Sequence, residues 1–99
     1  MLKAEMFDLH DGEFIDLGAS EVTNERYVIR FPSNYGIDIC SGELYHCDEN
    51  TYETAIVIFD DDIFYVDSDI KDNVFDYQTI ENIQELIDKV SKMSSQTLL

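Results

Sequence analysis

The stretch Thr51–Asp76 reads TYETAIVIFDDDIFYVDSDIKDNVFD and contains the two most hydrophobic runs of the chain. The runs are Ala55–Phe59 and Ile63–Val66. We predict strands at Glu53–Phe59 and Ile63–Val66, because both are apolar on both faces, which is typical of central strands that are covered on both sides or nearly so. The link Asp60–Asp62 between them suits a three-residue hairpin loop, because aspartate tolerates left-handed backbone better than most residues. We therefore predict a hairpin with both strands in the core and an acidic rim.

Strands are also predicted upstream of this hairpin. Apolar and polar residues alternate over Glu25–Phe31, which indicates a strand with one buried face. Pro32 ends it, since proline cannot donate to a strand ladder. Two short strands are expected at Ile37–Cys40 and Glu43–Cys47, joined at Ser41-Gly42.

The N-terminal segment allows two interpretations. Ala4–Leu9 and Glu13–Leu17 flank Asp11-Gly12, a dipeptide typical of two-residue hairpin turns, and we favour a hairpin there. Gly18–Asn24 is a loop by composition. The alternative is a helix, because three apolar residues share one helical face: Leu2, Met6 and Leu9.

A helix is predicted over Gln78–Met93, where apolar residues recur at helical spacing. Asp76 or Thr79 can cap its N-terminus. Asp67–Tyr77 before it is expected to be a loop with room for a short strand. The apolar stripe consists of Ile80, Ile83, Leu86, Ile87 and Val90.

Together these elements predict one α+β domain over residues 1–99. It consists of an antiparallel β-meander of five to six strands with one C-terminal helix packed on the sheet. Residues 94–99 are expected to fray.

The charge of the chain is its most unusual property. It has 22 acidic and 6 basic residues, a formal net charge of −16, against a magnitude of about 2–8 suggested for small soluble domains. Residues 31–70 contain ten acids and no lysine or arginine. Most of these acids must face water, a metal or a cationic partner. The charge argues against direct binding to nucleic acid or to an anionic membrane.

Seven aspartates form the candidate partner-binding set: Asp60, Asp61, Asp62, Asp67, Asp69, Asp72 and Asp76. Alternate residues of a strand project to one side about 6.7 Å apart, so rows of carboxylates roughly imitate the charge of a nucleic-acid backbone. The alternative is that these aspartates occupy turns and keep an exposed face soluble.

Metal chemistry matches the sequence poorly. Counted from Asp67 as a calcium loop, the fifth and sixth places hold Lys71 and Asp72 instead of an acid and a glycine, and the twelfth holds Gln78 instead of glutamate. The potential zinc ligands, Cys40, His46 and Cys47, lack the paired spacing of structural zinc sites. We expect no metal, no cofactor and no enzymatic activity.

The two cysteines and the hydropathy pattern predict a cytoplasmic protein. No apolar run approaches the roughly 18–20 residues of a membrane-spanning helix, and the N-terminus lacks the apolar core of a signal peptide. In a reducing compartment Cys40 and Cys47 are expected to be free thiols, although a disulfide across a hairpin is an alternative.

In size and charge, with Asp60–Asp62 and the four aspartates that follow, the chain resembles small acidic phage-encoded inhibitors. These are anti-CRISPR and anti-restriction proteins that imitate nucleic acid. The resemblance rests on no shared motif. It implies an inhibitor that occupies the basic channel of a bacterial defence enzyme, in the cytoplasm of the host cell.

Three other functions remain open. One is an immunity protein that neutralises a cationic nuclease toxin, and another is a calcium- or substrate-binding module. The third is a solvated domain whose acidity has no target. A monomer and a homodimer are both compatible with the sequence: an edge strand at Glu43–Cys47 can pair two copies, although Glu43 and Asp48 oppose this.

Overall fold

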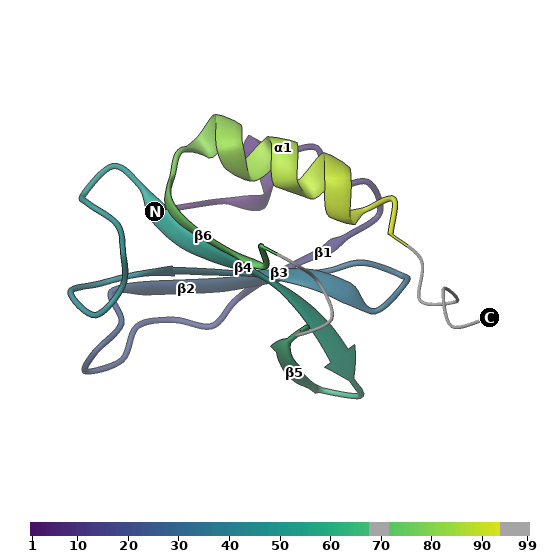
Figure 1. Cartoon of the computed structure of the whole chain (residues 1–99), viewed down its shortest axis with the longest axis horizontal. Coiled ribbons are helices and arrows are strands. Elements are labelled where there is room, and N and C mark those ends of the chain that lie inside the picture. Colours follow the sequence, from purple (N-terminus) through teal and green to yellow (C-terminus); the bar gives the residue numbers. More distant parts are fainter. Residues whose placement is uncertain (68–71, 94–99) are drawn as a thin grey trace.

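The computed structural model describes residues 1–67 and 72–93 and consists of a twisted sheet with a helix on one face (Figure 1). A 3-10 helix, Ala4–Met6, precedes the first strand. The remaining elements are β1 (Glu13–Asp16), β2 (Glu25–Arg30), β3 (Tyr35–Ser41), β4 (Tyr52–Asp60), β5 (Ile63–Val66), β6 (Val74–Gln78) and α1 (Ile80–Val90). Among these described residues, no helix is both long enough and apolar enough to cross a membrane.

The sheet confirms the predicted antiparallel meander with one helix packed on it. Strands β1 to β5 pair in chain order. The second edge of β4 is divided between two partners, because Val57–Asp60 pairs with β5 whereas β6 pairs with the first half of the strand, Tyr52–Ala55. This division places the two ends of the segment Asp60–Asp76 at opposite ends of β4.

The main core lies between α1 and the sheet, as the alternation of Glu25–Phe31 and the helical stripe predicted. Ile56 of β4 and Ile83 of α1 are both fully buried in it. The face of the sheet opposite α1, which we call the open face, carries a smaller cluster built on Val28, Val57 and Phe59. The other fully buried side chains of the main core include Ile29, Ile37, Ile39, Ile87 and Val90.

Helix α1 is shorter than predicted because Gln78 belongs to β6 and the helix ends at Val90. Thr79 is the N-cap: its Oγ1 accepts from the Asn82 N–H at 3.1 Å, and Asn82 Oδ1 accepts from the Thr79 N–H at 3.0 Å. Of the two predicted caps, the structure therefore selects Thr79 and excludes Asp76. Ile80, predicted in the buried stripe, is 38% exposed.

The prediction that Ile63–Val66 belongs to the core is wrong. Ile63 is 72% exposed and Tyr65 56% exposed, because β5 is a short edge strand on the side of the sheet away from α1 (Figure 1). Phe64 packs against Phe59, with ring centroids 5.1 Å apart. The loop is also shorter than predicted: Asp60 pairs with Ile63, which leaves a two-residue turn with Asp61 in the left-handed region (φ 55°).

The predicted N-terminal hairpin is also wrong, because Ala4–Leu9 is not a strand and β1 pairs with β2 instead. The segment packs beside the helix and is bonded to it. The Asp8 N–H donates to Gln84 Oε1 at 2.9 Å, and Gln84 Nε2 donates to the Asp8 carbonyl at 3.0 Å. Leu2 is buried, with Phe7 packed against the same core. The apolar residues thus serve burial and not strand pairing.

The predicted strand Glu43–Cys47 is a loop instead. Strand β3 continues to Ser41 and β4 pairs with it directly, with Cys40 opposite Glu53, so residues 43–47 have no free strand beside them. The edge strand suggested for pairing two copies therefore does not exist. The loop at residues 18–24 is confirmed. The short strand allowed within residues 67–77 is β6, which begins at Val74 and continues to Gln78.

Candidate functional site

The three aspartates of the β4–β5 turn, residues 60–62, are exposed, as predicted. Arg30 holds the turn in place: its Nη1 donates to the Asp61 carbonyl at 2.9 Å, and its guanidinium lies 4.7 Å from the Phe59 ring centroid. Because Arg30 bonds to the backbone of the turn, the carboxylates remain available at the surface.

The remaining predicted aspartates that the structure describes, Asp67, Asp72 and Asp76, do not extend this turn into one acidic row. Asp67 follows β5 and is buried, with its carbonyl accepting from Asn73 Nδ2 at 2.9 Å. Asp72 is exposed, with left-handed backbone (φ 57°), and Asp69 lies outside the described residues. Asp76 lies on β6 near Glu53, seven positions along β4 from Asp60, or about 23 Å in an extended strand.

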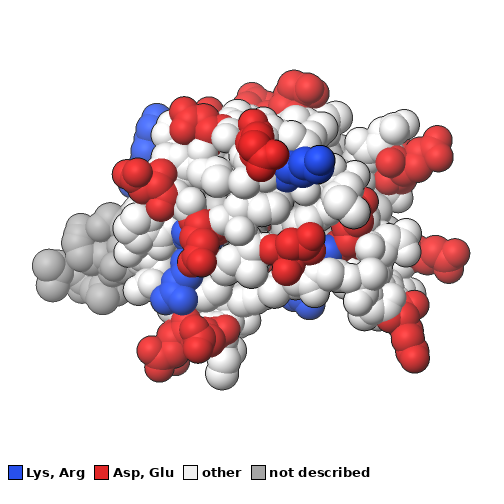
Figure 2. All heavy atoms as spheres, turned by 180° about the vertical axis from the view of Figure 1, so that it is seen from behind, with Lys and Arg blue, Asp and Glu red and all other residues white. Residues whose placement is uncertain are grey.

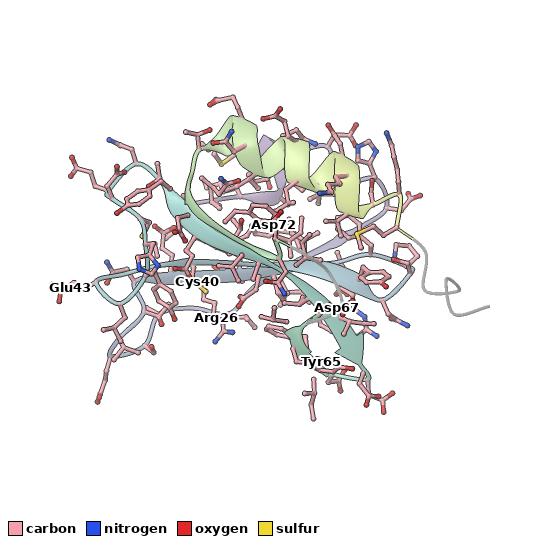
Figure 3. All side chains as sticks on the ribbon, viewed as in Figure 1. Arg26, Cys40, Glu43, Tyr65, Asp67 and Asp72 are labelled. Atoms are coloured by element: carbon pink, nitrogen blue, oxygen red, sulfur yellow. The ribbon has the colours of Figure 1, made fainter. Side chains whose placement is uncertain are left out.

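Acidic side chains also gather around a pocket of about 400 Å³ at the other end of the sheet. Its lining includes four acidic residues together with Cys47 and Tyr52, and none of the lysines or arginines in the described part of the chain belongs to it. Glu43 projects from the loop at this end of the molecule (Figure 3). The acidic lining residues are Glu25, Glu43, Asp48 and Glu49.

Two buried tyrosines orient the carboxylate of Glu25. The Tyr27 hydroxyl donates to its Oε1 at 2.6 Å, and the Tyr52 hydroxyl lies 3.3 Å from each of its oxygens. Burial, followed by the bond to Glu25, raises the pKa of Tyr27 to about 12. Burial also raises the pKa of Tyr52, with the charge of Glu25 as the next cause. Both hydroxyls therefore stay protonated at neutral pH and act as donors.

The arginines of the open face neutralise little of this acidity. Arg26 is bonded to Asp38 and lies 5.5 Å from the Phe64 ring centroid; the Asp38 bond is the main reason that its pKa is raised. Arg30 is bonded to the backbone of the β4–β5 turn. On the face seen in Figure 2, acidic side chains far outnumber basic ones and project around the rim. The surface is therefore strongly negative outside these local contacts.

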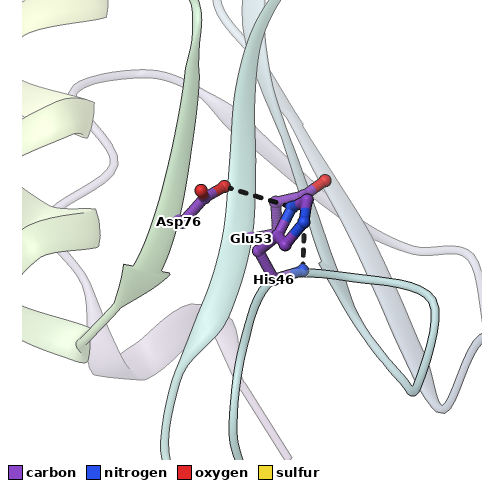
Figure 4. A group of neighbouring side chains, drawn as sticks. All are labelled: His46, Glu53 and Asp76. Atoms are coloured by element: carbon purple, nitrogen blue, oxygen red, sulfur yellow. Dashed lines mark hydrogen bonds and ion pairs between the residues drawn. The ribbon is translucent and has the colours of Figure 1, made fainter.

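The predicted zinc ligands do not come together, whereas a different set does. Among residues 1–67 and 72–93, the metal-ligating side chains whose ligand atoms converge are His46, Glu53 and Asp76, all within 4.8 Å of one another. Figure 4 shows them on a loop, on β4 and on β6. Cys40 and Cys47 are free thiols in the structure.

A β-bulge creates this convergence. Tyr52 pairs with Gln78 and Thr54 with Phe75, so Glu53 alone faces both Asp76 and Tyr77. The extra residue, Tyr77, has left-handed backbone (φ 53°) and donates its N–H to the His46 carbonyl at 2.9 Å. Bulges often redirect side chains beside functional sites.

The sequence does not predict this cluster, because the spacing of His46, Glu53 and Asp76 matches no known metal-binding motif. In the sequence, His46 lies beside Cys47 and suggests a zinc ligand, whereas Glu53 is one of ten acids between residues 31 and 70. Pairing of β4 with β6 brings Asp76 beside Glu53. The residue types alone do not predict a β-bulge in the pairing of β4 with β6.

Comparison with known proteins adds no relative. No protein-family model matches the chain, and neither a curated protein nor a solved structure matches it. The fold is that of an α+β protein with a strongly acidic surface. The resemblance to phage inhibitors receives no support from the comparisons and stays a prediction.

Proposed function

We propose that this protein inhibits a nucleic-acid-binding bacterial defence enzyme, a CRISPR effector or a restriction system, by occupying its basic channel. The observation that supports the proposal is the acidic pocket: Glu25, Glu43, Asp48 and Glu49 are among its lining residues, and within residues 1–67 and 72–93 no lysine or arginine lines it. A basic side chain from the channel is the chemical complement of such a cavity.

The pocket suits an arginine or lysine side chain better than a flat acidic surface does. Its volume of about 400 Å³ falls within the roughly 300–1,000 Å³ of ligand-binding clefts. Carboxylates bind guanidinium groups through paired charge-assisted hydrogen bonds. Glu25 is already bonded to Tyr27 and Tyr52, and its Oε1 lies 3.5 Å from the N-terminal ammonium group. The exposed side chains of Glu43 and Glu49 are therefore the carboxylates that a cation from the partner would bind.

The turn at Asp60–Asp62 supplies a second acidic contact at the opposite end of the sheet. The pocket and this turn are two separate negative regions, and such a pair fits an extended basic channel better than it fits one small basic patch. A net charge of −16 also accelerates association with a cationic surface at low ionic strength.

The first experiment is capture from a bacterial lysate at low salt, with mass spectrometry of the proteins that elute as salt rises. We expect a DNA- or RNA-binding enzyme that double-stranded DNA competes off the column. A captured nuclease toxin would instead indicate an immunity protein. Binding that resists salt and DNA would overturn charge mimicry.

Paired charge reversals then locate the contact surface. Glu43 and Glu49 line the pocket and are exposed, whereas Glu81 and Glu85 are exposed on α1. Changing both members of either pair to lysine alters the net charge equally. We expect only the Glu43→Lys/Glu49→Lys protein to lose affinity and salt dependence. If both double variants lost affinity equally, the pocket would not be the contact surface.

A further inference from the structure

We propose that His46, Glu53 and Asp76 form a binding site for a first-row divalent transition-metal ion such as Zn²⁺. The site is separate from the acidic pocket and does not depend on the inhibitor function. It combines one imidazole and two carboxylates from a loop, from β4 and from β6.

The distances from His46 Nδ1 to the two carboxylates are close to those that a metal requires, and all three ligand atoms lie within 4.8 Å of one another. His46 Nδ1 is 3.1 Å from Glu53 Oε1 and 3.7 Å from Asp76 Oδ1. A tetrahedral zinc ion with ligand bonds of about 2.0–2.2 Å places neighbouring ligand atoms about 3.3–3.6 Å apart. The two distances bracket that range, so small side-chain rotations accommodate the ion.

The backbone fixes the position of His46 on both sides. Its N–H donates to Glu53 Oε1 at 3.0 Å, and its carbonyl accepts from the Tyr77 N–H at 2.9 Å. These bonds tie the loop to β4 and to β6. Glu53 Oε1 can keep the backbone bond while it binds a metal, which is how supporting hydrogen bonds orient ligands in metal sites.

The charge of the cluster also favours a divalent cation. Two carboxylates complement two positive charges. Within the described part of the chain, neither Glu53 nor Asp76 forms an ion pair with a lysine or arginine; the ion pairs they make involve only His46. A bound metal would relieve the repulsion between the two acids without displacing a basic side chain.

His10, the second histidine of the chain, shows that two nearby carboxylates form a metal site only when both face the same ring nitrogen. His10 also lies near two acids, but its Nε2 faces Asp88 at 2.6 Å whereas its Nδ1 faces Asp8 at 3.8 Å. The carboxylates thus lie at opposite ring nitrogens, and a metal on either nitrogen can reach only one. In the His46 cluster both acids face the same nitrogen, so His10 is a matched control.

The ligand set selects transition metals over calcium and magnesium. Calcium requires about six to eight oxygen ligands, and magnesium retains most of its water. Imidazole nitrogen is a preferred ligand of zinc, copper, nickel and iron. The His46 side chain is 71% exposed and that of Asp76 49%, so remaining coordination positions face solvent and are open to water or to an outside ligand.

The test is calorimetric titration of the whole chain with Zn²⁺ in excess magnesium, which occupies weak acidic positions. We expect saturable binding of one ion and a raised melting temperature, since a ligand of the native state stabilises it. Asp76→Asn and His46→Ala should each weaken binding at least tenfold, because even loss of a supporting residue costs about 10–100-fold. His10→Ala should retain the wild-type affinity.

A residue-specific readout separates the site from general attraction to an acidic surface. In NMR spectra, Zn²⁺ should shift the imidazole signals of His46 at one equivalent and leave those of His10 unchanged. Asp76→Asn preserves side-chain shape, so its fold can be verified by circular dichroism before titration. Absence of saturable binding, unchanged affinity in Asp76→Asn, or an equal loss in His10→Ala would each overturn the proposal.

Discussion

Arg26 and Asp38 form a two-pronged ion pair on the open face of the sheet, with Nε 3.1 Å from Oδ1 and Nη2 3.0 Å from Oδ2. The pair joins β2 to β3 across the direction of the strands. The Arg26 guanidinium also lies over the Phe64 ring of β5. One arginine therefore links three strands.

Replacing Arg26 with lysine should lower the free energy of unfolding by about 1 kcal/mol, because lysine cannot make the paired contact and the site is partly exposed. Urea unfolding of Arg26→Lys, Asp38→Asn and the double variant measures the coupling. Arg30→Lys is the control, since Arg30 bonds to the Asp61 carbonyl and Asn34. If the coupling energy of Asp38 with Arg30 equalled that with Arg26, the specific ion pair between Arg26 and Asp38 would be contradicted.

Two isoleucines of the β4–β5 hairpin should differ sharply in their contribution to stability. Ile56 is fully buried, whereas Ile63 is 72% exposed. Ile56→Ala should lower the free energy of unfolding by about 2–5 kcal/mol, because it leaves a cavity. Ile63→Ala should change it by no more than about 0.5 kcal/mol. A large loss from Ile63→Ala in chemical denaturation would mean that β5 is buried in solution.

The N-cap of α1 offers a test of local chemistry. Thr79→Ala removes the bond from the Asn82 N–H to Oγ1 and should lower the free energy of unfolding by about 1 kcal/mol. Asp76→Ala, the matched control, should have no such effect on the helix. Thermal melting followed at 222 nm, in the presence of a chelator, measures both. A larger effect of Asp76→Ala would reverse the assignment of the cap.

The two thiols should react at very different rates. Cys40 is buried, and burial, followed by the charge of Asp38, raises the pKa of its thiol to about 12. Thiolate is the reactive form, so iodoacetamide at pH 8 should modify the more exposed Cys47 first. Mass spectrometry should detect Cys40 labelling only after denaturant is added. Early labelling of Cys40 in the native protein would contradict its burial.

One ion pair should contribute to the acid sensitivity of the fold. Hydrogen bonds from His10, and then from Gln84, lower the pKa of Asp88 from its ordinary value of 3.8. A lowered pKa stabilises the native state above pH 3.8, and this contribution disappears as pH falls through the native value. The stability difference between wild type and Asp88→Asn should therefore shrink below pH 3.8. If the stability difference between wild type and Asp88→Asn grew as the pH fell, the pKa of Asp88 would not be lowered in the native state.

The sequence predicted the strands and the helix correctly where burial on one face leaves a periodic pattern. The spacing from Ile83 to Val90 reflects the one buried side of α1. The alternation of Glu25–Phe31 places Tyr27 and Ile29 in the main core, although Val28 on the opposite face is buried as well. The sequence-based prediction failed at Ile63–Val66, because a continuous apolar run does not tell whether a second layer covers the strand. It failed at Ala4–Leu9, because packing against α1 replaced strand pairing.

By itself, the sequence determined the fold class, the acidic balance and the helix that closes the core, since these depend on composition and local period. Only the tertiary structure decided where the acids meet. Pairing of opposite halves of β4 with β5 and β6 separated Asp60 from Asp76, and a bulge of one residue turned Asp76 toward Glu53 and His46. Contacts between distant segments depend on strand register, and no residue type encodes register on its own.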